Sequence, residues 1–353
     1  MIKISCKSTL KGRVYLPFSK SLSNRVLLIK ALNNGSFTIN NLSSAEDTML
    51  MQKLLEEIKL TQQYNNSKKV FNAGNSGTVF RFLTAYCSIL PGEWILDGNV
   101  RMQQRPIYHL VDALEELGVK IKYLKKIGFP PICIKGGFIN KNYVAIDASI
   151  SSQFISALML IAPTIKGGLI INIKNDIASY PYIEMTSYIM DKFGVAVNYD
   201  KNFIIIPEGR YKNVDFNVEG DWTAASYYYL SIALAGGKIK LYNLVEESIQ
   251  GDKIISDIFN KYGVLSHFGK NTVEIFKLSH IKSNYFEQSF INYPDIFLTI
   301  AVACAALDIK AKLTGLSNLV YKESNRLDAF CENIRKCGFD VINNSNYEII
   351  ITG

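Results

Sequence analysis

The sequence ALEELGVKIKY, residues 113–123, has the pattern of a helix that stops on a glycine and continues into a strand. The same pattern recurs at intervals of roughly 70 residues in IMDKFGVAVNY (189–199), IFNKYGVLSHF (258–268) and NIRKCGFDVIN (333–343). Glycine accepts the left-handed conformation that ends a helix. The four glycines are Gly118, Gly194, Gly263 and Gly338. Each copy therefore predicts a unit of helix, strand, hairpin and strand.

A fifth and less regular copy precedes these four. It comprises a predicted helix over residues 48–58, a strand at LTQQY (60–64), a turn at Asn65-Asn66 and a second strand in KKVFNAG (68–74). Five copies of one helix-and-strand unit predict an α/β protein built from repeats. At 353 residues, the chain is too long for one ordinary core, so we expect two domains.

The composition is that of a globular protein with anionic partners. Hydrophobic residues make up 48% of the chain and charged residues 20%, and the net charge is +8. Nucleic acid, an acidic membrane surface or small phosphorylated metabolites would all suit that charge. The six cysteines and three histidines form no metal-binding pattern, so we expect reduced, buried thiols and no metal. The longest apolar stretch, residues 154–165, is too short to span a bilayer, and no signal-peptide core precedes it.

The segment PFSKSLSNRVLLIKAL, residues 17–32, predicts an anion-binding helix start. Pro17 ends an extended segment and Ser19 is a suitable N-cap. Lys20, Ser21 and Arg25 then add an ammonium group, a hydroxyl and a guanidinium to the free N–H groups of the first turn. The alternative is a basic first turn on a solvated helix.

Other stretches place polar groups beside predicted helix starts. GNSGTVFRFL (74–83) combines two glycines with Asn75, and RMQQRPIYHLVDAL (101–114) has two arginines before Pro106, where we expect a helix to begin. SISSQFISALMLIAP (149–163) has more hydroxyl and amide groups than capping requires. Each stretch alone also fits a plain turn, a cap or a surface.

Two stretches near the end of the chain carry carboxylates and cations. NYPDIFLTIAVACAAL (292–307) has a single Asp295 at the mouth of a buried helix, where an aspartate usually caps. In NLVYKESNRLDAF (318–330), Lys322, Glu323 and Arg326 fall within one expected helical turn. Asp221, in VEGDWTAASYY (218–228), is expected to be an N-cap.

These stretches resemble motifs of the enolpyruvyl transferases, and among them of the 5-enolpyruvylshikimate-3-phosphate synthase family. The matching segments, in chain order, are SKSLSNR, GNSGT, RMQQRPI, SSQF, SYPY, VEGDWTAA, QGD and KESNR. The resemblance implies a two-domain inverse α/β barrel of βαβαββ units, with helices inside and sheets outside. The first domain would cover residues 19–221, and the second residues 1–18 and 222–353, with a first strand from residue 1 to about residue 16.

The resemblance also implies a reaction and its residues. The enolpyruvyl group of phosphoenolpyruvate would pass to the 5-hydroxyl of shikimate 3-phosphate, on the route to chorismate and aromatic amino acids, without metal or cofactor. The implied ligands of shikimate 3-phosphate are Lys20, Ser21, Arg25, Ser151, Ser152, Gln153, Ser179, Asp295, Asn318 and Lys322. Those of phosphoenolpyruvate are Lys20, Asn75, Gly77, Arg105, Gln153 and Arg326.

Three of these residues have implied catalytic roles. Asp295 would be the base for the 5-hydroxyl, and Glu323 would exchange a proton with the methylene carbon. Lys20 would stabilise charge or share the role of Glu323. Several cations are needed because both substrates are highly anionic. We expect a cytoplasmic monomer that binds neither nucleic acid nor membrane.

The sequence departs from the family pattern in three places. Phe82 stands where the family usually has proline, and Asn325 where it usually has aspartate. The family's DHR motif and a further lysine are not found after Asn318. This predicts that the last repeat is missing, and raises the hypothesis of a truncated, weakly active or inactive binder of shikimate 3-phosphate.

Three other functions compete with this interpretation. A UDP-N-acetylglucosamine enolpyruvyl transferase would need a reactive cysteine in a loop, whereas Cys87 and Cys133 fall in apolar predicted elements. A non-catalytic binder of phosphometabolites would agree with the missing end. An RNA 3′-phosphate cyclase would need a nucleophilic histidine and RNA-type aromatic motifs, which the sequence lacks.

Overall fold

The computed structural model describes residues 9–33, 36–64, 69–278, 284–345 and 347–352. The chain forms two compact units. Unit 1 consists of Met1–Ser19, Glu219–Val320 and Arg326–Gly353, and unit 2 consists of Lys20–Val218 and Tyr321–Asn325. The five residues Tyr321–Asn325 therefore pack in unit 2, although the segments before and after them belong to unit 1. The domain boundaries inferred from the sequence stay a prediction.

Unit 2 contains two four-stranded sheets of identical topology. Their strand orders are β3-β4-β6-β5 and β7-β8-β10-β9, and in each the first pair is parallel and the others are antiparallel. The strands of the first sheet are Val70–Asn72 (β3), Gly92–Asp97 (β4), Lys120–Tyr123 (β5) and Ile132–Gly136 (β6). Those of the second are Tyr143–Ile146 (β7), Leu169–Ile173 (β8), Asn198–Asp200 (β9) and Phe203–Ile206 (β10). The helices between them are Gly77–Ile89 (α3), Tyr108–Glu116 (α4), Ser152–Ile161 (α5) and Pro181–Lys192 (α6), with short 3-10 turns at Met102–Gln104 (η1) and Ala162–Thr164 (η2).

Unit 1 repeats the same topology twice. Its sheets have the orders β1-β12-β14-β13 and β15-β16-β18-β17. The strands are Leu10–Tyr15 (β1), Gly237–Tyr242 (β12), Val264–Gly269 (β13), Thr272–Lys277 (β14), Tyr285–Ser289 (β15), Lys310–Thr314 (β16), Val341–Ser345 (β17) and Glu348–Ile351 (β18). The helices are Trp222–Ala235 (α7), Ile255–Lys261 (α8), Phe297–Ala306 (α9) and Arg326–Lys336 (α10), with 3-10 turns at Gly251–Ile254 (η3) and Ser317–Tyr321 (η4).

Unit 2 also contains two helices and two short strands that do not form a full copy of this unit. Helices Lys20–Leu32 (α1) and Glu46–Tyr64 (α2) accompany two short parallel strands, Ile39–Asn40 (β2) and Phe216–Asn217 (β11). The described residues thus contain four copies of a βαβαββ unit, which confirms the predicted repeat architecture. The prediction of a fifth copy ahead of them was wrong.

Two errors produced that fifth copy. Residues 60–64 continue helix α2 and are not a strand, because no glycine stands there to end the helix and leucine and glutamine favour it. Residues Val70–Asn72 are the first strand of the next unit, since β3 pairs in parallel with β4. The predicted turn at Asn65-Asn66, and residues 1–8 of the predicted first strand, lie outside the described residues.

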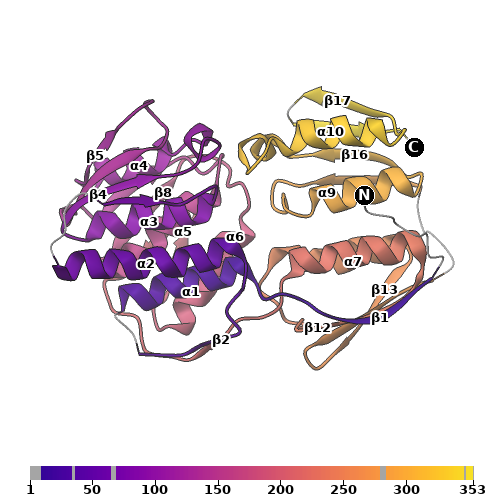
Figure 1. Ribbon diagram of the computed structural model, residues 1–353, viewed down its shortest axis with the longest axis horizontal. Coiled ribbons are helices and arrows are strands. Elements are labelled where there is room, and N and C mark those ends of the chain that lie inside the picture. Colours follow the sequence, from indigo (N-terminus) through magenta and orange to yellow (C-terminus); the bar gives the residue numbers. More distant parts are fainter. Residues whose placement is uncertain (1–8, 34–35, 65–68, 279–283, 346, 353) are drawn as a thin grey trace. The chain divides into compact units, whose positions relative to one another are not determined.

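The helices form because their sequences offer faces that bury. The helices that follow the first strand of three units, α3, α5 and α9, are apolar almost all round and mostly buried, as expected of helices that pack on several sides. In unit 1, helices α7, α9 and α10 lie side by side (Figure 1). Each of the four repeat glycines has a positive φ, between 77° at Gly263 and 103° at Gly118, which confirms their role as helix ends.

No helix in the described part of the chain is both long enough and apolar enough to cross a membrane. Within those same residues, no three histidine, cysteine or acidic side chains gather where they could hold a metal ion. The described cysteines are all free; Cys87, Cys304 and Cys331 are buried as expected, whereas Cys133 is half-buried and Cys337 exposed. Cys6 lies outside the described residues.

Candidate active site

The first turn of α1 carries an ion pair at its start. Helix α1 begins at Lys20, whose Nζ lies 2.9 Å from Oδ2 of Asp47 in the first turn of α2. Both side chains are partly exposed, so their contact adds little to stability. Ser19 was predicted to be the N-cap of α1, but its buried hydroxyl has no hydrogen-bond partner among the described residues. No signal in the sequence marked Asp47.

Arg25 is buried on the same helix. Its guanidinium donates to the hydroxyls of Thr186 (2.7 Å) and Ser156 (3.2 Å), and to the backbone oxygens of Ser21 (2.9 Å) and Tyr182 (3.1 Å). Burial lowers the pKa of Arg25 to about 10. The positively charged guanidinium of Arg25 is thus surrounded by neutral oxygens. This arrangement favours an anion nearby.

The segment GNSGT forms the tight turn that opens α3. Gly74 has a positive φ of 59°, and Ser76 is the N-cap, its hydroxyl accepting from Val79 N at 3.3 Å. At Gly77 the close neighbour is a side chain. A Cβ there would lie 2.6 Å from Nη2 of Arg105, so a guanidinium occupies the space that a side chain would need.

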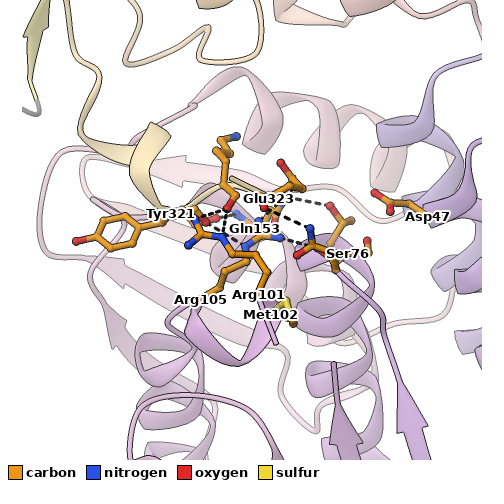
Figure 2. Close-up of polar contacts among 12 residues, drawn as sticks. Asp47, Ser76, Arg101, Met102, Arg105, Gln153, Tyr321 and Glu323 are labelled. Carbon is orange, nitrogen blue, oxygen red and sulfur yellow. Dashed lines mark hydrogen bonds and ion pairs between the residues drawn. The ribbon is translucent and has the colours of Figure 1, made fainter. Parts of the chain in front are cut away.

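Arg105 is a predicted ligand whose side chain is buried and hydrogen-bonded to two segments of unit 2. Its side chain is 2% exposed, and Nε donates to Tyr321 O at 3.0 Å while Nη1 donates to Asn75 O at 2.8 Å. Its Nη2 lies 3.4 Å from Oε1 of Glu323. Arg105 therefore joins the turn before α3 to the segment Tyr321–Asn325, as Figure 2 shows.

Arg101 makes a second connection to that segment, whereas the sequence left a surface role open as an alternative for it. Its Nε and Nη2 both donate to Lys322 O, at 3.2 and 2.8 Å. Asn75 Nδ2 donates to Glu323 O at 3.3 Å. The spacing of Arg101 and Arg105 was the signal that could have identified it, because both guanidinium groups reach the same stretch of backbone (Figure 2).

A helix begins close to Pro106, as predicted, since α4 starts at Tyr108 after a 3-10 turn at residues 102–104. The prediction for the segment that these arginines contact was wrong. Lys322 and Glu323 do not share a helical turn with Arg326, since they lie between the end of η4 and the start of α10. The backbone oxygens of Tyr321 and Lys322 accept hydrogen bonds from these arginines and not from the N–H groups of a helix.

The SSQF motif opens α5. Ser151 is the N-cap and accepts from Gln153 N at 3.3 Å, and Ser152 is buried. Gln153 Nε2 donates to Thr78 Oγ1 at 2.9 Å, and its Oε1 accepts from Arg81. Ser179, just before α6, is buried and has a positive φ of 62°, an uncommon conformation for serine.

Unit 1 brings two predicted residues together. Arg326 Nη1 donates to Asp295 Oδ1 at 2.7 Å, and both side chains are mostly buried. The N-cap of α9 is Ile296, so Asp295 stands one residue before the cap and pairs with Arg326. Asn318 is buried in η4. Asp221 is the N-cap of α7, as predicted, with its carboxylate accepting from Ala224 N at 3.0 Å.

In unit 2, five predicted residues lie close together, near two arginines that the sequence did not select, Arg81 and Arg101. The five are Asn75, Gly77, Arg105, Gln153 and Glu323. Their donors gather at the start of α3, where free backbone N–H groups also favour an anion. This group can bind a phosphate or carboxylate beside the carboxylate of Glu323.

A family model described as "EPSP synthase (3-phosphoshikimate 1-carboxyvinyltransferase)" matches residues 4–353. The chain belongs to the EPSP synthase family. Relatives named 3-phosphoshikimate 1-carboxyvinyltransferase include one from Bacteroides fragilis (strain YCH46), 36% identical over 350 residues, covering 98% of this chain and 82% of the relative. Another, from Sulfurovum sp. (strain NBC37-1), is 37% identical over 358 residues, covering 96% of this chain and 83% of the relative.

A solved EPSP synthase from Acinetobacter baumannii has the same fold, with a TM-score of 0.73 at 18% identity, covering 97% of this chain and 82% of that one. The family excludes the RNA cyclase alternative. A UDP-N-acetylglucosamine enolpyruvyl transferase would need a reactive cysteine in a loop. Neither of the two candidates is in a loop, because Cys87 lies inside α3 and Cys133 in β6. Burial raises the pKa of the Cys87 thiol well above its usual value.

Proposed function

We propose that this chain transfers the enolpyruvyl group of phosphoenolpyruvate to the 5-hydroxyl of shikimate 3-phosphate and releases phosphate. The observation that carries the proposal is the EPSP synthase match over residues 4–353. The 5-hydroxyl oxygen bonds to C2 of phosphoenolpyruvate while C3 gains a proton. Loss of a proton from C3 and of phosphate from C2 then restores the double bond in the product.

The contacts in unit 2 support a role for its residues with phosphoenolpyruvate. Arg105, Asn75, Gln153 and the N–H groups around Gly77 offer the donors that a phosphate needs. Glu323 stands beside Arg105 and is partly exposed, so it can exchange a proton with a carbon bound there. Lys20 would add a further positive charge.

For shikimate 3-phosphate, we propose the hydroxyls and cations predicted from the sequence, with Asp295 as the base for the 5-hydroxyl. The guanidinium of Arg326, 2.7 Å away, favours the ionised form of the Asp295 carboxylate, which is the form that can accept a proton. Arg326 also suits the carboxylate of phosphoenolpyruvate, because a guanidinium can bind a carboxylate through two parallel N–H groups.

Initial rates of phosphate release test this proposal. The chain should release phosphate only when both substrates are present. Asp295→Asn and Glu323→Gln should each lower kcat at least about 100-fold, the usual contribution of a proton-transfer group, while calorimetry still detects binding of shikimate 3-phosphate. Phosphate release that does not depend on shikimate 3-phosphate would contradict the proposal. No finding favours the alternative of an inactive binder.

We further propose a cytoplasmic monomer. Size-exclusion chromatography with light scattering, before and after addition of both substrates, measures the mass in solution directly. A mass near 39.7 kDa is expected. A stable dimer in either condition would contradict the proposal.

A further inference from the structure

Arg81 is a buried cation that the predicted site residues did not include. It lies in the second turn of α3, and its side chain is 3% exposed. The guanidinium contacts Oε1 of Gln153, and its Cζ lies 4.9 Å from the ring centre of Phe154. Both of these partners belong to the first turn of α5, so Arg81 ties α3 to the position of Gln153.

This contact fixes the orientation of the Gln153 amide. A guanidinium only donates hydrogen bonds, so the amide must turn its oxygen toward Arg81. The amide nitrogen then faces Thr78, and Nε2 donates to Thr78 Oγ1 at 2.9 Å. A flipped amide would place an NH₂ group against a cation. The second N–H of Gln153 is therefore held in one direction.

Arg81 also concentrates positive charge behind the start of α3. A Cβ at Gly77 would lie 2.6 Å from Nη2 of Arg105 and 2.8 Å from Nη1 of Arg81, so the two guanidinium groups flank the same glycine. Burial and the charge of Arg105 lower the pKa of Arg81 well below its usual value. Arg81 Nε is buried with no hydrogen-bond partner in the described part of the chain. An anion beside Gly77 would offset this repulsion.

We infer that Arg81 is a positioning residue for the phosphorylated ligand of unit 2. It holds the Gln153 amide in its donating orientation and raises the positive potential at Arg105, without itself contacting the substrate. This inference rests on the proposed function, since Gln153 and Arg105 are treated as ligands of phosphoenolpyruvate there.

A double-mutant cycle tests the inference. Arg81→Met, Gln153→Ala and the double variant are compared with the unchanged chain by KM for phosphoenolpyruvate, kcat, and calorimetric Kd in the presence of shikimate 3-phosphate. Arg81→Met should raise KM for phosphoenolpyruvate roughly 10- to 100-fold. In the Gln153→Ala background, Arg81→Met should cost less than it costs in the unchanged chain, because the part of its effect that passes through Gln153 is already lost. Arg81→Lys, which keeps the charge, should recover part of the loss.

Thr84→Val is the matched control. Thr84 is buried on the same helix, and its hydroxyl donates to Phe80 O of that helix at 2.8 Å, so its replacement should leave KM unchanged. Urea unfolding checks that each variant is folded; if Arg81→Met does not fold, Arg81→Lys takes its place in the cycle.

If the increases in KM caused by the two substitutions simply multiply in the double variant, the two residues act independently and the inference is overturned. The proposed function would remain intact, provided that the unchanged chain forms product. An unchanged chain that forms no product would overturn both.

Discussion

Replacement of Arg105 by lysine should cost both stability and affinity. The guanidinium donates to two backbone oxygens, Tyr321 O at 3.0 Å and Asn75 O at 2.8 Å, from two different nitrogens. A lysine ammonium in the same space reaches one of them but lacks the rigid fork needed for both. At least one charge-assisted hydrogen bond is lost, worth about 1.5–3 kcal/mol.

The Glu323 contact adds little to this value. Its carboxylate is 43% exposed and 3.4 Å from Arg105, so solvent limits the pair to about 1 kcal/mol or less. We therefore expect the free energy of unfolding to fall by about 2–3 kcal/mol. Urea unfolding with an unchanged m-value measures it. KM for phosphoenolpyruvate should rise in the same variant.

The control makes the same substitution on the surface of the same unit. Arg210 is exposed, so Arg210→Lys should change the free energy of unfolding by no more than about 0.5 kcal/mol. An Arg105→Lys variant that unfolds at the same urea concentration as the Arg210→Lys control would refute the reasoning, because the two bonds to backbone oxygens would then contribute nothing.

Three further predictions follow from single contacts. Ser76→Ala removes the N-cap of α3 and should lower the free energy of unfolding by about 1 kcal/mol in urea titrations; no change would show that the cap bond is not made in solution. Gly77→Ala places a methyl group 2.6 Å from Arg105 Nη2, so KM for phosphoenolpyruvate should rise more than KM for shikimate 3-phosphate; equal changes would contradict the assigned contact. Burial raises the pKa of Glu219 above its ordinary 4.5, so ionisation of this carboxyl group opposes folding. The stability of the unchanged chain relative to Glu219→Gln should therefore fall as the pH rises from 4.5 through the raised pKa. A difference in urea midpoints that does not depend on pH would contradict this.

The repeat architecture could be predicted from the sequence because its signals are local. A glycine that ends a helix, followed by a strand and a hairpin, depends on neighbours in the chain. Gly118 and Gly194 have the positive φ that the pattern requires. The pattern failed at residues 60–64, where no such glycine occurs and the helix continues to Tyr64.

The contacts of the candidate site were less predictable because they join distant segments. The pairing of Asp295 with Arg326, and of Arg101 with the Lys322 backbone, depends on how separate elements pack. Arg81 carried no motif of its own, and only its burial against Gln153 distinguishes it from a surface arginine. Motif spacing therefore selected candidate residues but could not supply their partners.

We propose that this chain joins two phosphorylated substrates by moving an enolpyruvyl group. Phosphorus NMR of a mixture of the chain, shikimate 3-phosphate and phosphoenolpyruvate follows each phosphorus separately. We predict that the phosphoenolpyruvate signal converts to inorganic phosphate, while the phosphate ester of shikimate remains and shifts as the product forms. Two unchanged substrate signals after prolonged incubation, or inorganic phosphate formed without shikimate 3-phosphate, would contradict the claim.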